Sequence, residues 1–302
     1  MTAVLPTISI VTPSFNQGKF LDDAMRSVLT QGYPNLEYVV MDGGSSDCSV
    51  EVIRKYEDRL IYWESQPDQG QYDAINRGFA RTTGGIMAWL NSDDMYTPLT
   101  FSLVADIFAS FPKIEWLTSM HPVTWDAHGQ AVKIDFTGGF SRQSFEKGGN
   151  FPGKGSHGRR WIQQESTFWR RSLWERAGGR LDTSLQLAAD FELWARLFQH
   201  ADLYGVNVQL GGFREHGDQL SVHRREQYMH ECEETLRSYG RWPCSKLEDL
   251  LRGGFWKVFR LHSLTPFPLP VRLALIRAGV FYPTQVLVRS GGKWEIISGL
   301  SV

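Results

Sequence analysis

The 302-residue chain has few cysteines, no long apolar run and almost no net charge. Its three cysteines, Cys48, Cys232 and Cys244, are widely spaced and form no Cys-x-x-Cys pair. This pattern argues against a disulfide framework or a zinc knuckle and favours a reducing compartment. Arginines interrupt the longest apolar candidate, so we expect no membrane-spanning helix. No basic segment precedes an apolar run at the N-terminus, so we expect no secretory signal either.

The net charge of -1 argues against a strongly basic protein that binds nucleic acid along its whole length. The charge is nevertheless uneven, because residues 251–302 carry +6 and the remainder carries -7. Aromatic and leucine residues alternate with these basic residues. Residues 251–295 therefore suit a basic amphipathic segment that lies on an anionic membrane surface. The alternative is that their aromatic side chains pack on the domain or on a second subunit.

Two common phosphate-binding motifs are also missing. The first apolar segment, Ile8–Thr12, leads into Pro13–Gly18 and not into a Gly-x-Gly-x-x-Gly turn. The sequence has no Walker loop. NAD-binding and P-loop functions are therefore disfavoured.

What the chain does contain is an alternation of short β-branched runs with segments of helical spacing. We expect strands at 8–12, 36–41, 60–63 and 86–90, and helices at 20–29, 50–56, 73–82 and about 97–110. Such alternation predicts a mainly parallel sheet with right-handed crossovers. Further along we expect a strand at 114–119, a hairpin at 123–136, a long loop at 138–160, a helix at 190–198, strands at 203–208 and 210–214, and a helix at 221–239.

Carboxylates recur where the expected strands end. Asp93 and Asp94 directly follow the strand at 86–90, and Asp42, Asp68 and Asp190 occupy comparable positions. The carboxyl edge of an open α/β sheet is where ligands bind. Adjacent carboxylates repel each other unless a cation shares them, so the cluster indicates a divalent metal together with a phosphorylated ligand. The alternative for Asp93 and Asp94 is a solvated loop that caps the next helix.

Six ordered blocks between Ile8 and Ser221 resemble bacterial family 2 glycosyltransferases of the GT-A fold. The blocks are 11–16, 40–47, 72–78, 90–94, 164–170 and 190–194. The resemblance implies an α/β, GT-A fold over residues 1–245, with a Rossmann-like, mainly parallel sheet and helices on both faces. Residues 246–302 fall outside the resemblance, and we expect them to form a helical, amphipathic, basic and aromatic-rich C-terminal extension.

The resemblance also implies an activity. We expect an inverting, metal-dependent hexosyltransferase that moves one sugar from a nucleotide-diphosphate-sugar donor to a saccharide or lipid-linked saccharide acceptor, in surface polysaccharide biosynthesis. It would act in the cytoplasm or on the inner face of the cytoplasmic membrane. Processive members carry a Gln-x-x-Arg-Trp motif. Here His157 precedes Arg160-Trp161 and Ser238 precedes Arg241-Trp242, so addition of a single sugar is expected.

For the donor, the resemblance assigns packing on the nucleotide base to Pro13 and Phe15, and a hydrogen bond to the base or ribose to Asp42. Asp73 and Arg77 would contact the sugar or phosphates. The residues themselves leave simpler roles open, because Asp42 can cap its own turn and Arg77 can be a helix-surface charge.

For the metal, the resemblance makes Asp94 the direct ligand of Mn²⁺ or Mg²⁺, and Asp93 a contact to ribose or metal. Arg214 would reach the diphosphate, and His216 would be a further metal ligand. The structural alternative for His216 also stays open.

For the acceptor, the resemblance assigns binding to Gln164 and Glu165, and the role of catalytic base to Asp190. The family often has an acidic residue directly before this base, whereas this chain has Ala189. Asp190 can instead be an N-cap, and Glu165 can pair with an arginine.

Two other classes of protein stay open from the sequence alone. A sugar-phosphate nucleotidyltransferase shares the Rossmann-like half and the metal carboxylates, but it releases pyrophosphate. A non-catalytic saccharide-binding protein would not depend on Asp94 or Asp190 for its activity in cells.

Overall fold

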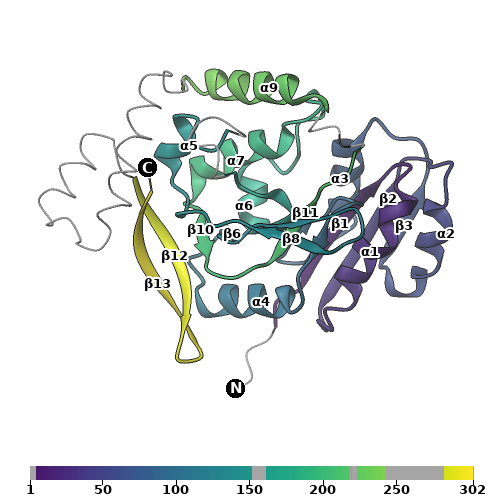
Figure 1. Cartoon of the computed structure of the whole chain (residues 1–302), viewed down its shortest axis with the longest axis horizontal. Coiled ribbons are helices and arrows are strands. Elements are labelled where there is room, and N and C mark those ends of the chain that lie inside the picture. Colours follow the sequence, from purple (N-terminus) through teal and green to yellow (C-terminus); the bar gives the residue numbers. More distant parts are fainter. Residues whose placement is uncertain (1–4, 152–160, 218, 220–222, 242–281, 302) are drawn as a thin grey trace, which may run out of the picture.

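The computed structural model describes residues 5–151, 161–217, 219, 223–241 and 282–301. Within these residues the strands form a nine-stranded sheet, in the order β13-β12-β10-β6-β9-β4-β1-β2-β3, and a four-stranded sheet, in the order β5-β11-β7-β8. Figure 1 shows helices on both faces of the larger sheet. The mixed α/β architecture with a mainly parallel central sheet is therefore confirmed.

The first half of the chain follows the expected strand–helix alternation. β1 is buried along its whole length and lies parallel between β2 and β4, and β2 lies parallel to β3. The strands are β1 (Ile8–Ser14), β2 (Leu36–Asp42), β3 (Tyr62–Ser65) and β4 (Ile86–Trp89), and the helices are α1 (Gly18–Leu29), α2 (Ser49–Arg54), η1 (Glu57–Arg59), α3 (Gln71–Phe79) and α4 (Thr100–Ser110).

Helix α3 packs closely on β1 because Gly78 faces the sheet. A Cβ atom at this position would lie 2.5 Å from Cγ1 of Val11. Only glycine therefore allows this approach without a shift of the helix. The close packing fixes the start of α3 beside the carboxyl ends of β1 and β4.

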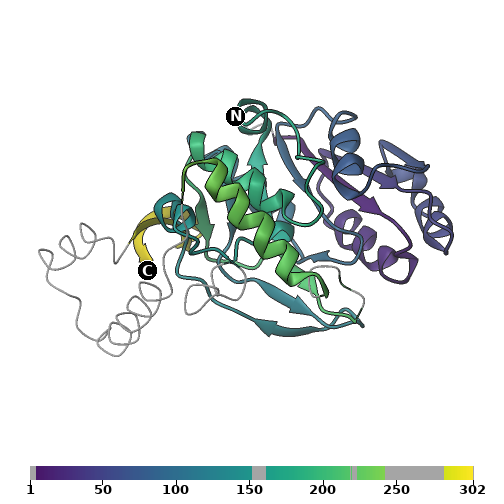
Figure 2. The ribbon, with the colours of Figure 1, turned by 90° about the horizontal axis from the view of Figure 1, so that it is seen from above.

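The second half of the larger sheet is mixed. β9 (Thr167–Arg170) lies antiparallel to both β4 and β6 (Trp116–Ser119), and β10 (Tyr204–Val206) is parallel to β6. Four helices accompany these strands: α5 (Arg142–Glu146), α6 (Arg171–Arg176), α7 (Ala189–His200) and α9 (Arg225–Ser238). A short helix, η2 (Gln164–Ser166), leads into β9. Figure 2 shows α9 lying across the outer side of α7.

A cluster of buried tryptophans holds α7 against the sheet. Trp194 of α7 stacks on Trp89 of β4 and on Trp116 of β6, with ring centroids 6.1 Å and 5.7 Å apart, and it meets Trp169 of β9 edge-on. Each buried aromatic side chain contributes a large apolar area and a defined geometry. The cluster therefore fixes α7, and with it the residues at the N-terminus of that helix.

The smaller sheet contains the predicted hairpin. β7 (Val123–Trp125) and β8 (Ala131–Ile134) pair antiparallel, while β11 (Gly211–Arg214) lies between β7 and β5 (Met95–Tyr96). Sequence analysis did not predict β5. Its pairing with β11 brings the Asp94 segment next to Arg214, although these residues are far apart in the sequence.

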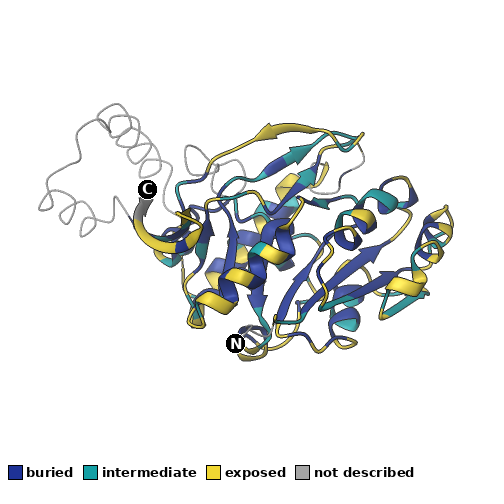
Figure 3. Cartoon of the chain, turned by 90° about the horizontal axis from the view of Figure 1, so that it is seen from below, coloured by how far each residue is buried: buried dark blue, intermediate teal, exposed yellow. Residues whose placement is uncertain are grey.

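The predicted helical extension is wrong for residues 282–301. These residues form β12 (Tyr282–Ser290) and β13 (Lys293–Ser301), and β12 extends the larger sheet by pairing in parallel with β10. Trp294 is buried, and its Nε1 donates a hydrogen bond to Asp106 Oδ2 of α4 at 3.0 Å. The remaining β13 residues with described burial are exposed (Figure 3). This part of the extension packs on the domain, and residues 242–281 lie outside the described residues.

No helix in the described part of the chain is long and apolar enough to span a bilayer.

Candidate active site

A cavity of about 820 Å³ lies at the carboxyl edge of the larger sheet. Asp68, one of the carboxylates at the expected strand ends, lines it. So do seven of the twelve residues to which the resemblance assigned a role: Pro13, Phe15, Asp93, Gln164, Glu165, Asp190 and His216. The other five, Asp42, Asp73, Arg77, Asp94 and Arg214, are not among the lining residues. The first group comes from β1, the β4–β5 loop, η2, α7 and the segment after β11, so the fold gathers residues that are up to two hundred positions apart.

Asp93 and His216 meet on the wall of the cavity. His216 Nε2 lies 3.0 Å from Asp93 Oδ2. The imidazole ring also packs on Phe20 of α1, with ring centroids 4.4 Å apart. The contact with Phe20 and the bond to Asp93 fix the orientation of the imidazole ring.

Asp94, the predicted direct metal ligand, is placed differently from Asp93, because its side chain is not among those that line the cavity. The side chain is fully buried, with 1% exposure. Its Oδ1 accepts the backbone N–H of Arg214 at 2.9 Å, and its Oδ2 accepts the Asn91 amide at 3.1 Å. Burial, followed by the charges of Asp93 and Glu165, raises the pKa of Asp94 well above its usual range. Asp94 therefore ties the β4–β5 loop to β11.

Arg214 does not reach the cavity either, although we expected it to contact the diphosphate. Its guanidinium is buried and lies against Asp23 of α1, with both NH1 and NH2 3.1 Å from Asp23 Oδ2. It also lies over the ring of Phe20, 5.0 Å from the centroid. Arg214 thus anchors β11 to α1, because a buried guanidinium needs a counter-charge.

Asp42 accepts hydrogen bonds from its own turn and from the neighbouring strand β3. Its oxygens accept the backbone N–H groups of Gly44 and Ser45 and the hydroxyls of Ser45 and Ser65. Gly44 adopts a positive φ of 82°, which completes the turn. This bonding matches the turn-capping alternative and places Gly43 and Gly44 on the cavity wall.

Asp73 and Arg77 lie on α3, outside the lining of the cavity. Arg77 forms an ion pair with Glu64 of β3, and its NH1 lies 3.7 Å from Asp73 Oδ2. Asp73 also accepts the backbone N–H of Gln69 at 3.3 Å. Both residues therefore support the loop before α3, and the helix-surface alternative describes Arg77 better than a donor contact.

Gln164 and Glu165 form the floor of the cavity. The Gln164 amide donates to the carbonyl of Trp89 at 2.6 Å. Within the described residues, Glu165 Oε1 and Gln164 Oε1 are buried and have no hydrogen-bond partner. Burial, with the nearby charges of Asp190 and Asp93, raises the pKa of Glu165 to about 8. Glu165 therefore lies close enough to Asp190 and Asp93 for their negative charges to disfavour its ionisation.

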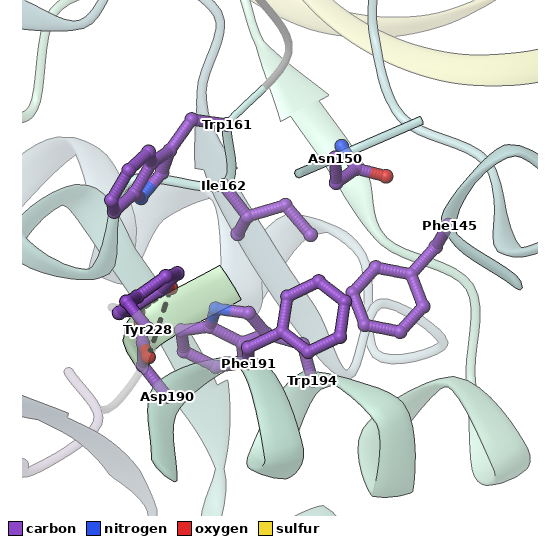
Figure 4. Close-up of a pocket in the computed structure, with 8 residues that line it drawn as sticks. All are labelled: Phe145, Asn150, Trp161, Ile162, Asp190, Phe191, Trp194 and Tyr228. Carbon is purple, nitrogen blue, oxygen red and sulfur yellow. Dashed lines mark hydrogen bonds between the residues drawn. The ribbon is translucent and has the colours of Figure 1, made fainter. Parts of the chain in front are cut away.

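Asp190 stands in the first turn of α7 and lines the cavity together with Trp161 and Tyr228. Figure 4 shows these three residues in a second pocket, which they also line. The hydroxyl of Tyr228, from α9, lies 3.3 Å from each Asp190 oxygen. Trp161 stacks on Tyr228 with centroids 5.4 Å apart. Burial raises the pKa of Asp190 to about 6, and the hydrogen bond from Tyr228 opposes the increase.

Several lining residues were missed by sequence analysis, among them Trp161, Gln186, Phe213 and Tyr228. Tyr228 is the most informative case. It is one aromatic residue in a charged helix, and helical periodicity gives no signal that distinguishes it from a core residue. Only the packing of α9 on α7 brings it to Asp190.

The residues around Asp93 suit a divalent metal that also binds phosphates. Mg²⁺ is usually held by one or two carboxylates and substrate phosphates, and Mn²⁺ accepts imidazole as well. Asp93 and His216 offer one such carboxylate and one imidazole. Across the described ranges, no group of three or more His, Cys, Asp or Glu side chains is arranged to hold a metal alone. The donor set thus fits a metal that takes further ligands from its substrate.

Known proteins were compared with the chain. The profile described as Glycosyl transferase family 2 matches residues 9–122. The uncharacterized glycosyltransferase Rv1514c of Mycobacterium tuberculosis (strain ATCC 25618 / H37Rv) is 31% identical over 198 residues, which cover 63% of this chain and 68% of that protein. TuaG of Bacillus subtilis (strain 168), named for teichuronic acid biosynthesis, is 31% identical over 99 residues, or 32% of this chain and 39% of TuaG.

Solved structures share the fold. S. aureus TarS 1-349 in complex with UDP-GlcNAc superposes with a TM-score of 0.57 at 14% identity, covering 76% of this chain and 64% of that chain. The mannosyltransferase PcManGT from Pyrobaculum calidifontis, in complex with GDP-Man and Mn²⁺, gives a TM-score of 0.58 at 14% identity, covering 91% and 80%.

The chain therefore has the GT-A fold that these two structures share. The profile match and the relative from M. tuberculosis specify the family, and the chain belongs to glycosyl transferase family 2.

Proposed function

We propose that the chain is an inverting, metal-dependent, non-processive glycosyltransferase that moves one hexose from a nucleotide-diphosphate sugar to a saccharide or lipid-linked saccharide acceptor. The observation that carries this proposal is that Asp93 with His216, and Asp190, line the same cavity. Asp93 and His216 suit the diphosphate end of a donor, and the Asp190 carboxylate suits the attacking hydroxyl of an acceptor. The similarity to TuaG supports a role in surface polysaccharide assembly. The GT-A domain proposed for residues 1–245 would contain all of these groups.

On the donor side, Pro13 and the exposed ring of Phe15 would pack on the nucleotide base. Asp42 would shape the turn that presents Gly43 and Gly44 to it. Asp93 and His216 would hold Mn²⁺ or Mg²⁺, and the metal would supply positive charge to the diphosphate as it leaves. In this proposal Asp93 takes the ligand role that sequence analysis gave to Asp94.

On the acceptor side, Asp190 would accept the proton of the acceptor hydroxyl. The hydroxyl oxygen then forms a bond to the anomeric carbon while the bond from that carbon to the diphosphate oxygen breaks. A single displacement inverts the anomeric configuration. A pKa of about 6 leaves Asp190 ionised at neutral pH yet more basic than an ordinary aspartate, as a general base requires. Gln164 and Glu165 would bind sugar hydroxyls through their unpaired buried oxygens.

The test is a panel of UDP-, GDP- and dTDP-sugars with Mn²⁺, in which release of nucleoside diphosphate is measured by chromatography. We expect release from at least one donor, and its loss in Asp190→Asn and Asp93→Asn. Asp58→Asn, on the exposed helix η1, is the matched control and should retain activity. Release of pyrophosphate would instead indicate a nucleotidyltransferase. No turnover with any donor, together with no thermal shift, would contradict an enzymatic function.

A further inference from the structure

The N-terminus of α7 has no cap of its own. The N-cap residue is Ala188, whose side chain cannot accept a hydrogen bond. The first backbone N–H groups of a helix have no partner within the helix and must find one elsewhere. Asp190, the proposed base, stands two residues after this position. The chain that enters α7 therefore depends on another element for its hydrogen bonds.

The first N–H group of the helix, that of Ala189, lies 3.4 Å from the Tyr72 hydroxyl. Helix α9 binds the backbone just before the helix through Glu231. Its Oε2 accepts the N–H groups of Leu187 and Ala188, both at 2.9 Å, and its Oε1 lies 3.4 Å from the Gln186 nitrogen. The Gln227 amide donates to Oε1 at 3.1 Å and holds the carboxylate in place. Glu231 thus anchors the residues directly before α7, near the helix N-terminus, where a carboxylate also complements the helix dipole.

One turn before Glu231, Tyr228 lies on the same face of α9. Its hydroxyl is placed between the two oxygens of Asp190, 3.3 Å from each, and its ring is buried under Trp161 (Figure 4). One helix face therefore contacts both the backbone before Asp190 and its carboxylate. Figures 1 and 2 show α9 lying outside α7, where it can hold the start of that helix in place.

We propose that Tyr228 and Glu231 are positioning residues of the transferase: Glu231 fixes the backbone that enters α7, and Tyr228 fixes the rotamer of the Asp190 carboxylate. The inference rests on the proposed function, in which Asp190 is the base. Neither residue needs to touch the reacting atoms. Their effect is to hold the base where an acceptor hydroxyl can reach it, since small displacements of a catalytic group reduce the rate strongly.

The two residues act on the proton affinity of Asp190 in opposite directions. The hydroxyl of Tyr228 stabilises the carboxylate and lowers the pKa of Asp190, whereas the negative charge of Glu231 raises it. Other titratable groups around Asp190 come from α3, η2 and α9, and they are Tyr72, Glu165 and Cys232. A conservative change at position 228 should therefore raise the pKa of Asp190, and a conservative change at position 231 should lower it.

The first experiment follows the Asp190 carboxyl by ¹³C NMR in the full-length protein, with the signal assigned by its absence from Asp190→Asn. We expect Tyr228→Phe to raise the midpoint by about one pH unit and Glu231→Gln to lower it by about half a unit. Tyr239→Phe and Glu234→Gln, on the same helix or its cap, are matched controls, because Tyr239 contacts Glu192 and Glu234 contacts His230. Midpoints that do not move, or that move in the same direction, would overturn the inference.

The second experiment measures steady-state kinetics with the donor that the nucleotide-sugar panel identifies. Glu231→Ala should lower kcat by about 10- to 100-fold with the donor KM changed less than about twofold, and Glu231→Gln, which keeps one acceptor oxygen, should recover most of kcat. An unchanged kcat in Glu231→Ala would refute the positioning role. If Asp190→Asn itself retains full activity, the proposed function fails, while the NMR titration still decides whether α9 controls the Asp190 carboxyl.

Discussion

Replacing Asp190 with asparagine is expected to stabilise the protein while it abolishes turnover. The wild-type carboxylate is held on the cavity wall, where burial raises its pKa from an ordinary 3.8 to about 6. Ionisation is therefore easier in the unfolded chain than in the folded one. Asparagine has nearly the same shape and can still bond to Tyr228, but it carries no charge and does not titrate.

The sign follows from proton linkage. Between about pH 4 and pH 6 the folded protein retains a proton on Asp190 that the unfolded chain has released, so the free energy of unfolding falls as pH rises through this window. A shift of about two pH units corresponds to at most about 3 kcal/mol, and partial contact with the cavity solvent reduces it to about 1–2 kcal/mol. The stability gain of Asp190→Asn should therefore be absent at pH 4 and complete above about pH 6.5.

The assay is thermal unfolding of both proteins from pH 4 to pH 8. We expect the difference in Tm to grow from near zero to about 2–5 °C across this range. The same variant should lose about 10²- to 10⁴-fold in kcat, as removal of a general base does. A Tm difference that is independent of pH would refute the raised pKa, even if activity is lost.

Three further changes test other parts of the structure. Asp93→Ala should abolish the rise in Tm caused by Mn²⁺ with the nucleoside diphosphate of the donor that the panel identifies. Asp94→Ala leaves two buried donors unpaired and should lower the Tm of the ligand-free protein by about 5 °C. The reverse pattern would return the ligand role to Asp94. Gly78→Ala should reduce the free energy of unfolding in urea by about 2 kcal/mol because its Cβ would meet β1, and an unchanged value would mean that α3 can move. Trp294→Ala should cost about 3 kcal/mol through lost packing and the lost bond to Asp106, and a wild-type Tm would contradict the packing of β13.

The strand–helix alternation of the first hundred residues could be read from the sequence because each element is short and its apolar spacing is distinct. β1 and β4 are buried along their whole length and β2 from Tyr38 onward, and all three are rich in apolar residues, which is typical of parallel strands. The structure of the C-terminal extension was harder to predict from the sequence. The aromatic, leucine and basic residues that suggested a membrane segment lie mainly at 255–269, outside the described residues. The later part of the extension forms β12, whose partner β10 is far away in the chain.

Within the site, sequence order indicated which acids lie near the sheet edge but not which of them face the cavity. Asp93 and Asp94 are adjacent in sequence, yet only Asp93 lines the cavity, because the pairing of β5 with β11 turns Asp94 toward the backbone of Arg214. Arg214 itself was expected at the diphosphate and instead pairs with Asp23. Such assignments depend on side-chain direction after folding, which motif spacing does not contain.

The parallel pairing of β10 with β12 has a consequence for how the chain folds. β10 ends at Val206, and β12, which covers its outer edge, begins only at Tyr282. During synthesis, β10 is therefore an unpaired edge strand until this later segment has been made. Contacts between distant segments form slowly, and open edges invite pairing with other chains. Truncations that remove β12 should therefore yield a protein that aggregates during expression, even though every residue lining the cavity is still present.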